Sequence, residues 1–206
     1  MLWVMIKGGP VMIPIVLASI IGLAIIIEKT WAILSIRTDV QKFTDEVITK
    51  VRMGKYEQAI NQCTRHSKFP IASTLKAGLE KRDLPSAEVE KVMERVGNAH
   101  IKNLERYIGG LISIIGIEPL LGFLGTITGL IRAFMAWEKA GSNITVSQLA
   151  GGIYEAMITT AAGLIVAVPY YLICNVIISR IKYISYELSD SSMQLAEALV
   201  EAKHRK

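Results

Sequence analysis

The chain has 206 residues, 51% of them hydrophobic, and a formal net charge of +5 at pH 7. Its apolar residues are concentrated in long runs, which excludes an ordinary soluble domain, and its cations flank those runs, which argues against nucleic-acid binding. Its two cysteines, Cys63 and Cys174, are too few to form a disulfide framework.

Three apolar runs each approach the roughly 20 residues that an α-helix needs to cross a bilayer. Residues 11–27 and 156–179 carry no charge, and residues 108–131 carry only Glu118. We therefore predict an all-α membrane protein. The first run is expected to remain as an anchor, because it lacks the basic start and the cleavage site of a signal peptide. The three transmembrane helices are expected at 11–34, 109–137 and 150–180.

Lysine and arginine gather after the first and third spans and before the second, whereas the connection between the second and third spans is nearly free of them. The positive-inside rule therefore predicts a cytoplasmic helical domain at 35–108 and a cytoplasmic C-terminal helix at 181–206. The short N-terminus at 1–10 and the loop at 138–149 are expected on the opposite side. The apolar spacing from Pro85 onward predicts a helix that continues into the second span without a break.

Small and hydroxyl-bearing residues collect on one face of each of the last two spans, within about 100° of arc. On the second span this face consists of Gly122, Gly125, Thr126, Gly129, Ala133 and Ala136. On the third span it consists of Gly152, Ala156, Thr159, Thr160, Gly163 and Ala167, with Glu155 just off its edge. Glycine faces are typical of membrane helices that pack closely, and that interpretation alone explains a single face.

Two matched faces with hydroxyl groups at mid-depth also favour a polar wall that faces protein or water. An ionised residue such as Glu155 tends to face protein or water, because a charge at the centre of a span costs at least about 2.5 kcal/mol. Arg132 lies near the outer end of its span, where its side chain can snorkel. For Glu118, which precedes Pro119, a local salt bridge or hydrogen bond is as good an explanation as transport chemistry.

No pattern in the chain predicts catalysis. The sequence has no phosphate-binding glycine loop, no zinc-ligand spacing and no GxSxG motif, so we expect neither an enzyme nor a bound cofactor or metal.

The chain resembles the ExbB/TolQ/MotA family of proton-channel stator subunits over nearly its whole length. The resemblance is carried by GPVMIPIVLASIIGLAIIIEKTW in the first span, EPLLGFLGTITGLIRAF in the second and GGIYEAMITTAAGLIVAVPYYLICNVI in the third. The paired GxxGTxxG and EAxxTTAxGLxxAxP patterns are specific in combination. Three spans with an external N-terminus are more similar to ExbB and TolQ than to MotA, which typically has four spans.

The resemblance implies a ring of identical subunits, a pentamer in this family, in the bacterial inner membrane, with a periplasmic N-terminus and a cytoplasmic C-terminus. The ring would enclose the membrane helices of an ExbD- or TolR-like partner, which carries the proton-binding aspartate, and would drive a TonB- or TolA-like protein. Thr126 and Thr160 match the pore threonines of the family and Glu155 its third-span glutamate, while Thr159 adds a second hydroxyl. The resemblance implies that these four residues line the proton pathway. Glu118 stands where a small or apolar residue is expected.

Other interpretations stay open on the residues alone. The motifs suit both outer-membrane import, the ExbB role, and envelope constriction, the TolQ role. A channel that needs no partner is disfavoured, because the spans contain no aspartate and no carboxylate–histidine chain. A purely structural membrane scaffold would use the two faces for helix packing alone.

Overall fold

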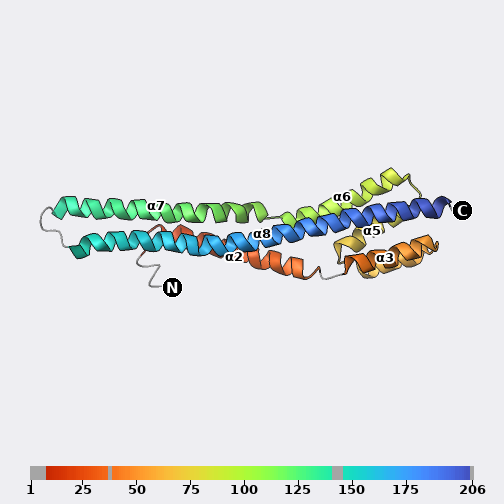
Figure 1. Ribbon diagram of the computed structural model, residues 1–206, viewed down its shortest axis with the longest axis horizontal. Coiled ribbons are helices and arrows are strands. Elements are labelled where there is room, and N and C mark those ends of the chain that lie inside the picture. Colours follow the sequence, from red (N-terminus) through yellow and green to blue (C-terminus); the bar gives the residue numbers. More distant parts are fainter. Residues whose placement is uncertain (1–7, 37–38, 141–145, 205–206) are drawn as a thin grey trace. The chain divides into compact units, whose positions relative to one another are not determined.

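The computed structural model describes residues 8–36, 39–140 and 146–204, and the regular structure within these ranges is entirely helical (Figure 1). Parts of the N-terminus predicted at 1–10 and of the loop predicted at 138–149 lie outside the described residues. The helices are α2 (Met12–Leu34), α3 (Val40–Arg52), α4 (Tyr56–Arg65), α5 (Pro70–Glu80), α6 (Ser86–Glu105), α7 (Ile108–Ala140) and α8 (Val146–His204).

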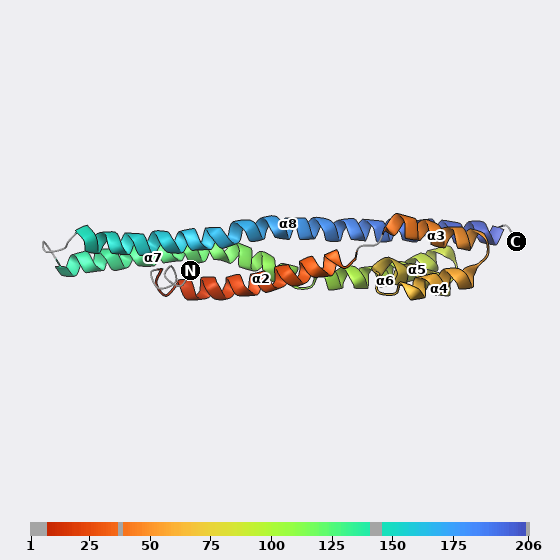
Figure 2. The ribbon, with the colours of Figure 1, turned by 90° about the horizontal axis from the view of Figure 1, so that it is seen from below.

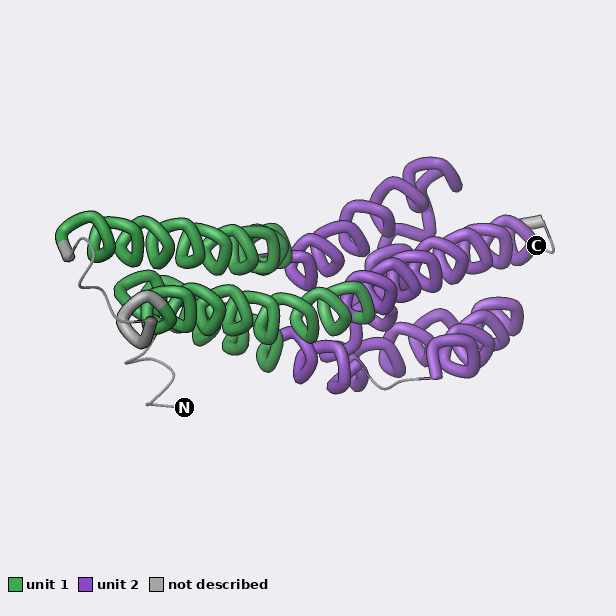
Figure 3. Tube along the Cα trace, turned by 60° about the vertical axis from the view of Figure 1, so that its left-hand side comes forward, with its two compact units in different colours: residues 1–28, 107–176 green, residues 29–106, 177–206 purple. Residues whose placement is uncertain are grey.

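The chain divides into two compact units, each built from two separate stretches of sequence (Figure 3). Unit 1 comprises residues 1–28 and 107–176, and unit 2 comprises residues 29–106 and 177–206. Both α2 and α8 therefore contribute residues to both units, whereas α7 belongs to unit 1 and α3 to α6 belong to unit 2.

Unit 1 is a packed set of three apolar helices, α2, α7 and the first part of α8 (Figures 1 and 2). Each of the three helices is long and apolar enough to cross a membrane. Large apolar side chains point outward, as Phe123, Ile165 and Leu172 do with 62%, 71% and 60% of their surface exposed. A water-soluble unit would bury such side chains, so this arrangement fits a hydrocarbon surrounding.

Helix α2 approaches both of its neighbours in unit 1. The hydroxyl of Tyr170 on α8 donates a hydrogen bond of 2.8 Å to the carbonyl oxygen of Ser19 on α2. A Cβ atom placed on Gly22 would lie 2.7 Å from the Tyr170 ring and 3.3 Å from Ile114 on α7. The missing side chain at Gly22 therefore allows α2 to fit against α7 and α8 together.

Unit 2 is built from amphipathic helices around an apolar core. Buried residues from α3, α4, α5 and α6 pack with the C-terminal part of α8, and Figure 2 shows α3 alongside that part. Thr44 of α3 donates a buried hydrogen bond of 3.0 Å to Ser191 of α8. The largest fully buried apolar side chains of this core are Val47, Val51, Leu75, Leu79, Val89, Met93 and Leu195.

The ends of the short helices follow local rules. Asp39 caps α3 by accepting a hydrogen bond of 3.1 Å from the backbone of Lys42. At the other end Gly54 adopts a left-handed φ of 72°, and the Gly54 and Lys55 amides bond back to the carbonyls of Val51 and Lys50. This pattern closes a helix when a glycine follows it.

The structure corrects two expectations about helix ends. The helix from Pro85 does not continue into the second span, because α6 ends at Glu105 and Tyr107 takes a left-handed φ of 69° before α7 begins. The connection between α7 and α8 is also shorter than the predicted 138–149, because α7 continues to Ala140 and α8 begins at Val146. The extension of α7 beyond its apolar run carries no sequence signal, whereas the start of α8 agrees with the capping-box pattern TVSQ at 145–148, which predicts a helix start there.

We predict that Leu75→Ala opens unit 2 and exposes the Cys63 thiol. Both side chains are fully buried in the same core, and burial raises the pKa of Cys63 to about 11, so the folded protein protects the thiol at neutral pH. Loss of a buried leucine costs about 2–5 kcal/mol, which corresponds to a rise in the opening population of about thirtyfold or more. Alkylation kinetics at neutral pH, in the full-length chain with Cys174→Ala as background, measure the effect.

Met53→Ala is the matched control, because the Met53 side chain is 63% exposed and its truncation leaves no cavity. Equal alkylation rates for the Leu75→Ala and Met53→Ala variants would contradict the core assignment.

Candidate functional site

The small-residue faces of α7 and α8 pack directly against each other within one chain. A Cβ atom placed on Gly129 would lie 2.9 Å from the Cβ of Ala156 and 3.2 Å from its backbone nitrogen. One placed on Gly122 would lie 3.1 Å from the Cα of Thr160. The two backbones are therefore in contact, which only residues without a side chain permit.

The same contact extends along the whole interface. A Cβ atom on Gly125 would collide with the Thr159 side chain, and one on Gly163 would lie 2.5 Å from the carbonyl oxygen of Glu118. Four glycines of the two small-residue faces thus lie at the α7–α8 interface and are buried: Gly122, Gly125, Gly129 and Gly163.

Two of the predicted pore threonines meet across this interface. The hydroxyls of Thr126 and Thr160 hydrogen-bond to each other, and the Thr160 hydroxyl also lies 3.0 Å from the carbonyl oxygen of Gly122. Both threonines are only partly buried, whereas Gly125 and Gly129 beside them are fully buried. The hydroxyl pair therefore lies at a partly exposed edge of the interface.

Glu155 lies at the same interface but has a different partner. Its carboxylate pairs with the guanidinium of Arg132 on α7 at 2.8 Å, and the two side chains are 27% and 47% exposed. Gly9 covers the pair, since a Cβ atom there would collide with the Glu155 carboxylate, and its left-handed φ of 69° also suits glycine. The residues just before α2 therefore hold the ion pair on one side.

Thr159 belongs to the ion-pair side and not to the threonine pair. Its hydroxyl lies 2.8 Å from the carbonyl oxygen of Gly8 and 2.9 Å from that of Glu155, and the residue is fully buried. The predicted residues thus form two groups, the threonine pair Thr126–Thr160 and the ion pair Arg132–Glu155 with Thr159. The sequence did not indicate that Arg132 and Glu155 pair, although opposite charges in neighbouring spans are the signal that could have suggested it.

Glu118 has neither of the local interactions that the sequence suggested. Its side chain is 0% exposed, and both carboxyl oxygens lack a hydrogen-bond partner in the described part of the chain. The salt bridge is absent because the nearest cations along the chain, Arg106 and Arg132, lie about three helical turns or more away.

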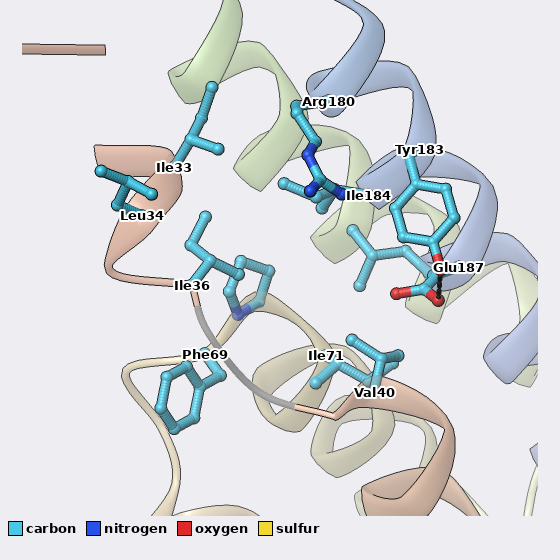
Figure 4. Close-up of a pocket in the computed structure, with 12 residues that line it drawn as sticks. Ile33, Leu34, Ile36, Val40, Phe69, Ile71, Arg180, Tyr183, Ile184 and Glu187 are labelled. Carbon is cyan, nitrogen blue, oxygen red and sulfur yellow. Dashed lines mark hydrogen bonds between the residues drawn. The ribbon is translucent and has the colours of Figure 1, made fainter. Parts of the chain in front are cut away.

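A groove in unit 2 offers no comparable chemistry (Figure 4). It encloses about 280 Å³ and is lined mainly by apolar side chains, among them Ile33, Phe69 and Ile184. Its polar groups are Arg180 and the pair in which the Tyr183 hydroxyl donates to Glu187 at 2.6 Å. The α7–α8 interface is therefore the better candidate site.

These features define a class of protein: a polytopic helical membrane protein whose second and third spans pack through glycines beside paired threonines. Comparison with known proteins specifies the family. Residues 66–190 match the MotA/TolQ/ExbB proton channel family. The chain therefore belongs to the MotA/TolQ/ExbB proton channel family, and it is a multi-pass inner-membrane protein.

Individual relatives agree with this assignment. The chain is 36% identical over 179 residues to the biopolymer transport protein ExbB-like 1 of Synechocystis sp., an alignment that covers 84% of this chain and 68% of that protein. It is 29% identical over 184 residues to the Tol-Pal system protein TolQ of Haemophilus influenzae, covering 82% and 78%. It is 27% identical over 208 residues to the biopolymer transport protein ExbB of Pseudomonas putida, covering 94% and 61%.

We predict that Gly163→Ala separates α7 from α8, because the added Cβ meets a backbone carbonyl that no side-chain movement can relieve. Overpacking of this kind costs about 1–3 kcal/mol. Gly151→Ala in the same helix is the control, because nothing lies within 4 Å of its added Cβ. Detergent-induced unfolding of the full-length protein in mixed micelles measures both, and equal stability of the two variants would refute the close approach.

Proposed function

We propose that this chain is an ExbB-like stator subunit that uses the proton motive force to energise a TonB-like protein for transport across the outer membrane. The Thr126–Thr160 pair carries the proposal, because it places two hydroxyls at a partly exposed edge of the α7–α8 interface in a chain of the proton channel family. In this proposal the identical subunits form a ring, a pentamer, with the threonine edges toward its interior. The lysines and arginines around the spans support a periplasmic N-terminus and a cytoplasmic C-terminus.

The proton-binding aspartate belongs, in this proposal, to a single-span ExbD- or TolR-like partner inside the ring. The apolar runs of this chain contain no aspartate of their own, which supports a division of labour between two proteins. Thr126 and Thr160 offer hydrogen bonds to water and to that aspartate, while Glu155 and Thr159 hold the outer part of the wall in place through Arg132 and Gly8.

The free energy released by proton passage is large enough to move the partner from one position in the ring to another. One proton that crosses about 100 mV supplies about 2.3 kcal/mol, enough to bias conformations that differ by a few kcal/mol. Protonation of the partner's aspartate removes its charge and shifts its preferred contact from one subunit to the next. The resulting motion is passed to the TonB-like protein.

A TolQ-like role is the second candidate. It is supported by the similarity to the Haemophilus influenzae protein, which aligns over a larger share of its own length than the Pseudomonas putida ExbB does. In that case the partner is TolR-like and the driven protein is TolA-like, and the chemistry at the threonine pair is unchanged.

We predict that Thr160→Val lowers proton flux about tenfold while the complex still assembles. Valine preserves the shape of threonine but removes the hydroxyl that reaches Thr126 and the Gly122 carbonyl, and one hydrogen bond of about 1.4 kcal/mol corresponds to a factor of ten. The measurement is proton uptake by proteoliposomes that contain this chain co-purified with its single-span partner.

Thr128→Val is the matched control, because the Thr128 hydroxyl bonds only to carbonyls of its own helix in the described structure, 3.0 Å from Leu124 and 3.1 Å from Gly125. Full flux in Thr160→Val would remove the threonine pair from the pathway. Equal flux from this chain alone would indicate a channel that needs no partner, and a stable complex without flux would indicate a scaffold.

A further inference from the structure

A carboxyl group that the proposed pathway does not use lies in the interior of unit 1. Glu118 of α7 is 0% exposed within a single chain, so assembly with other subunits can only add to its cover. Both of its oxygens lack a hydrogen-bond partner among the described residues, and no ion pair involves it there. Buried polar groups in folded proteins nearly always have a hydrogen-bond partner, so a buried carboxyl group without one requires an explanation.

No cation in the described part of the chain forms an ion pair or hydrogen bond with the Glu118 carboxyl. Tyr170 of α8 is the ionisable side chain that interacts with it electrostatically, and the Tyr170 hydroxyl already donates to the Ser19 carbonyl of α2. Along α2, residues 12–27 contain no ionisable side chain. On the α8 side, Gly163 packs against the backbone carbonyl oxygen of Glu118. This contact leaves no room for a larger side chain at position 163.

An ionised carboxylate in this position would be costly. A charge removed from water without a partner costs several kcal/mol or more, whereas a neutral polar group without a hydrogen bond costs about 1–3 kcal/mol. A hard metal cation requires several oxygen ligands, and among the described residues no cluster of acidic, histidine or cysteine side chains that could hold a metal includes Glu118. A proton requires only the carboxylate itself.

We propose that Glu118 is a proton-binding site of this chain, occupied at neutral pH, so that the folded subunit carries the side chain as a neutral acid. The site lies on the buried face of α7, one turn from Gly122, whose carbonyl accepts the Thr160 hydroxyl. It is separate from the aspartate assigned above to the partner, and it does not depend on the proposed coupling role, because the proton is held within one chain.

Infrared spectroscopy of the full-length protein in lipid nanodiscs tests the proposal directly. A protonated carboxylic acid has a C=O stretching band that an ionised carboxylate lacks. We expect this band at neutral pH in the wild-type protein and its loss in Glu118→Gln. Glu88→Gln, which changes an exposed glutamate of unit 2, is the control and should keep the band. A band of equal area in Glu118→Gln and wild type, or no band in the wild type, would overturn the proposal.

The pH dependence of the free energy of unfolding is a second test, and it is measured only on variants that fold. Glutamine is a neutral residue of nearly the same shape, so Glu118→Gln should have near wild-type stability below about pH 4, where the glutamate is protonated in the folded and the unfolded chain alike. Because the unfolded chain solvates the carboxylate and releases its proton above the ordinary glutamate pKa of about 4.3, the wild-type protein should lose stability relative to Glu118→Gln as the pH rises above that value. Parallel pH profiles for the two proteins would refute a proton held at Glu118, whatever the outcome of the flux measurements.

Discussion

The contact between the backbones of α7 and α8 is the constraint on which the site depends. Lipid provides no hydrophobic drive for helices to associate, so close packing and interhelical hydrogen bonds must hold them together. Gly122, Gly129 and Gly163 allow the helices to approach until a hydroxyl of one helix, that of Thr160, reaches a carbonyl of the other. The register of this contact also sets Arg132 opposite Glu155. Packing geometry and polar chemistry are therefore one feature of unit 1.

Much of unit 1 could be predicted from the sequence, because a bilayer imposes a length and a composition on every helix that crosses it. The three apolar runs gave the three spans, and helical periodicity placed the glycines and threonines on one face of each helix. Periodicity does not say what a face contacts. The faces of α7 and α8 meet each other, and the partly exposed pair Thr126 and Thr160 lies at the edge of their contact.

The features that escaped prediction depend on tertiary contacts. The Arg132–Glu155 pair joins residues 23 positions apart, and its formation depends on the register of the hairpin. The break before α7 falls at Tyr107, which is neither glycine nor proline, so no local signal marked it. Glu118 is ambiguous for the same reason: its sequence neighbours do not reveal that its side chain is buried without a hydrogen-bond partner among the described residues.

The turn at Gly8 and Gly9 has a consequence for mutational tolerance. These residues precede α2, and residues just before a first helix ordinarily tolerate many substitutions. Gly9, however, combines a left-handed backbone with a Cα that lies against the Glu155 carboxylate, and the Gly8 carbonyl accepts the Thr159 hydroxyl. Any side chain at Gly9 would have to displace an ion pair that sits between two spans. This short turn should therefore vary as little as the interior of the membrane helices.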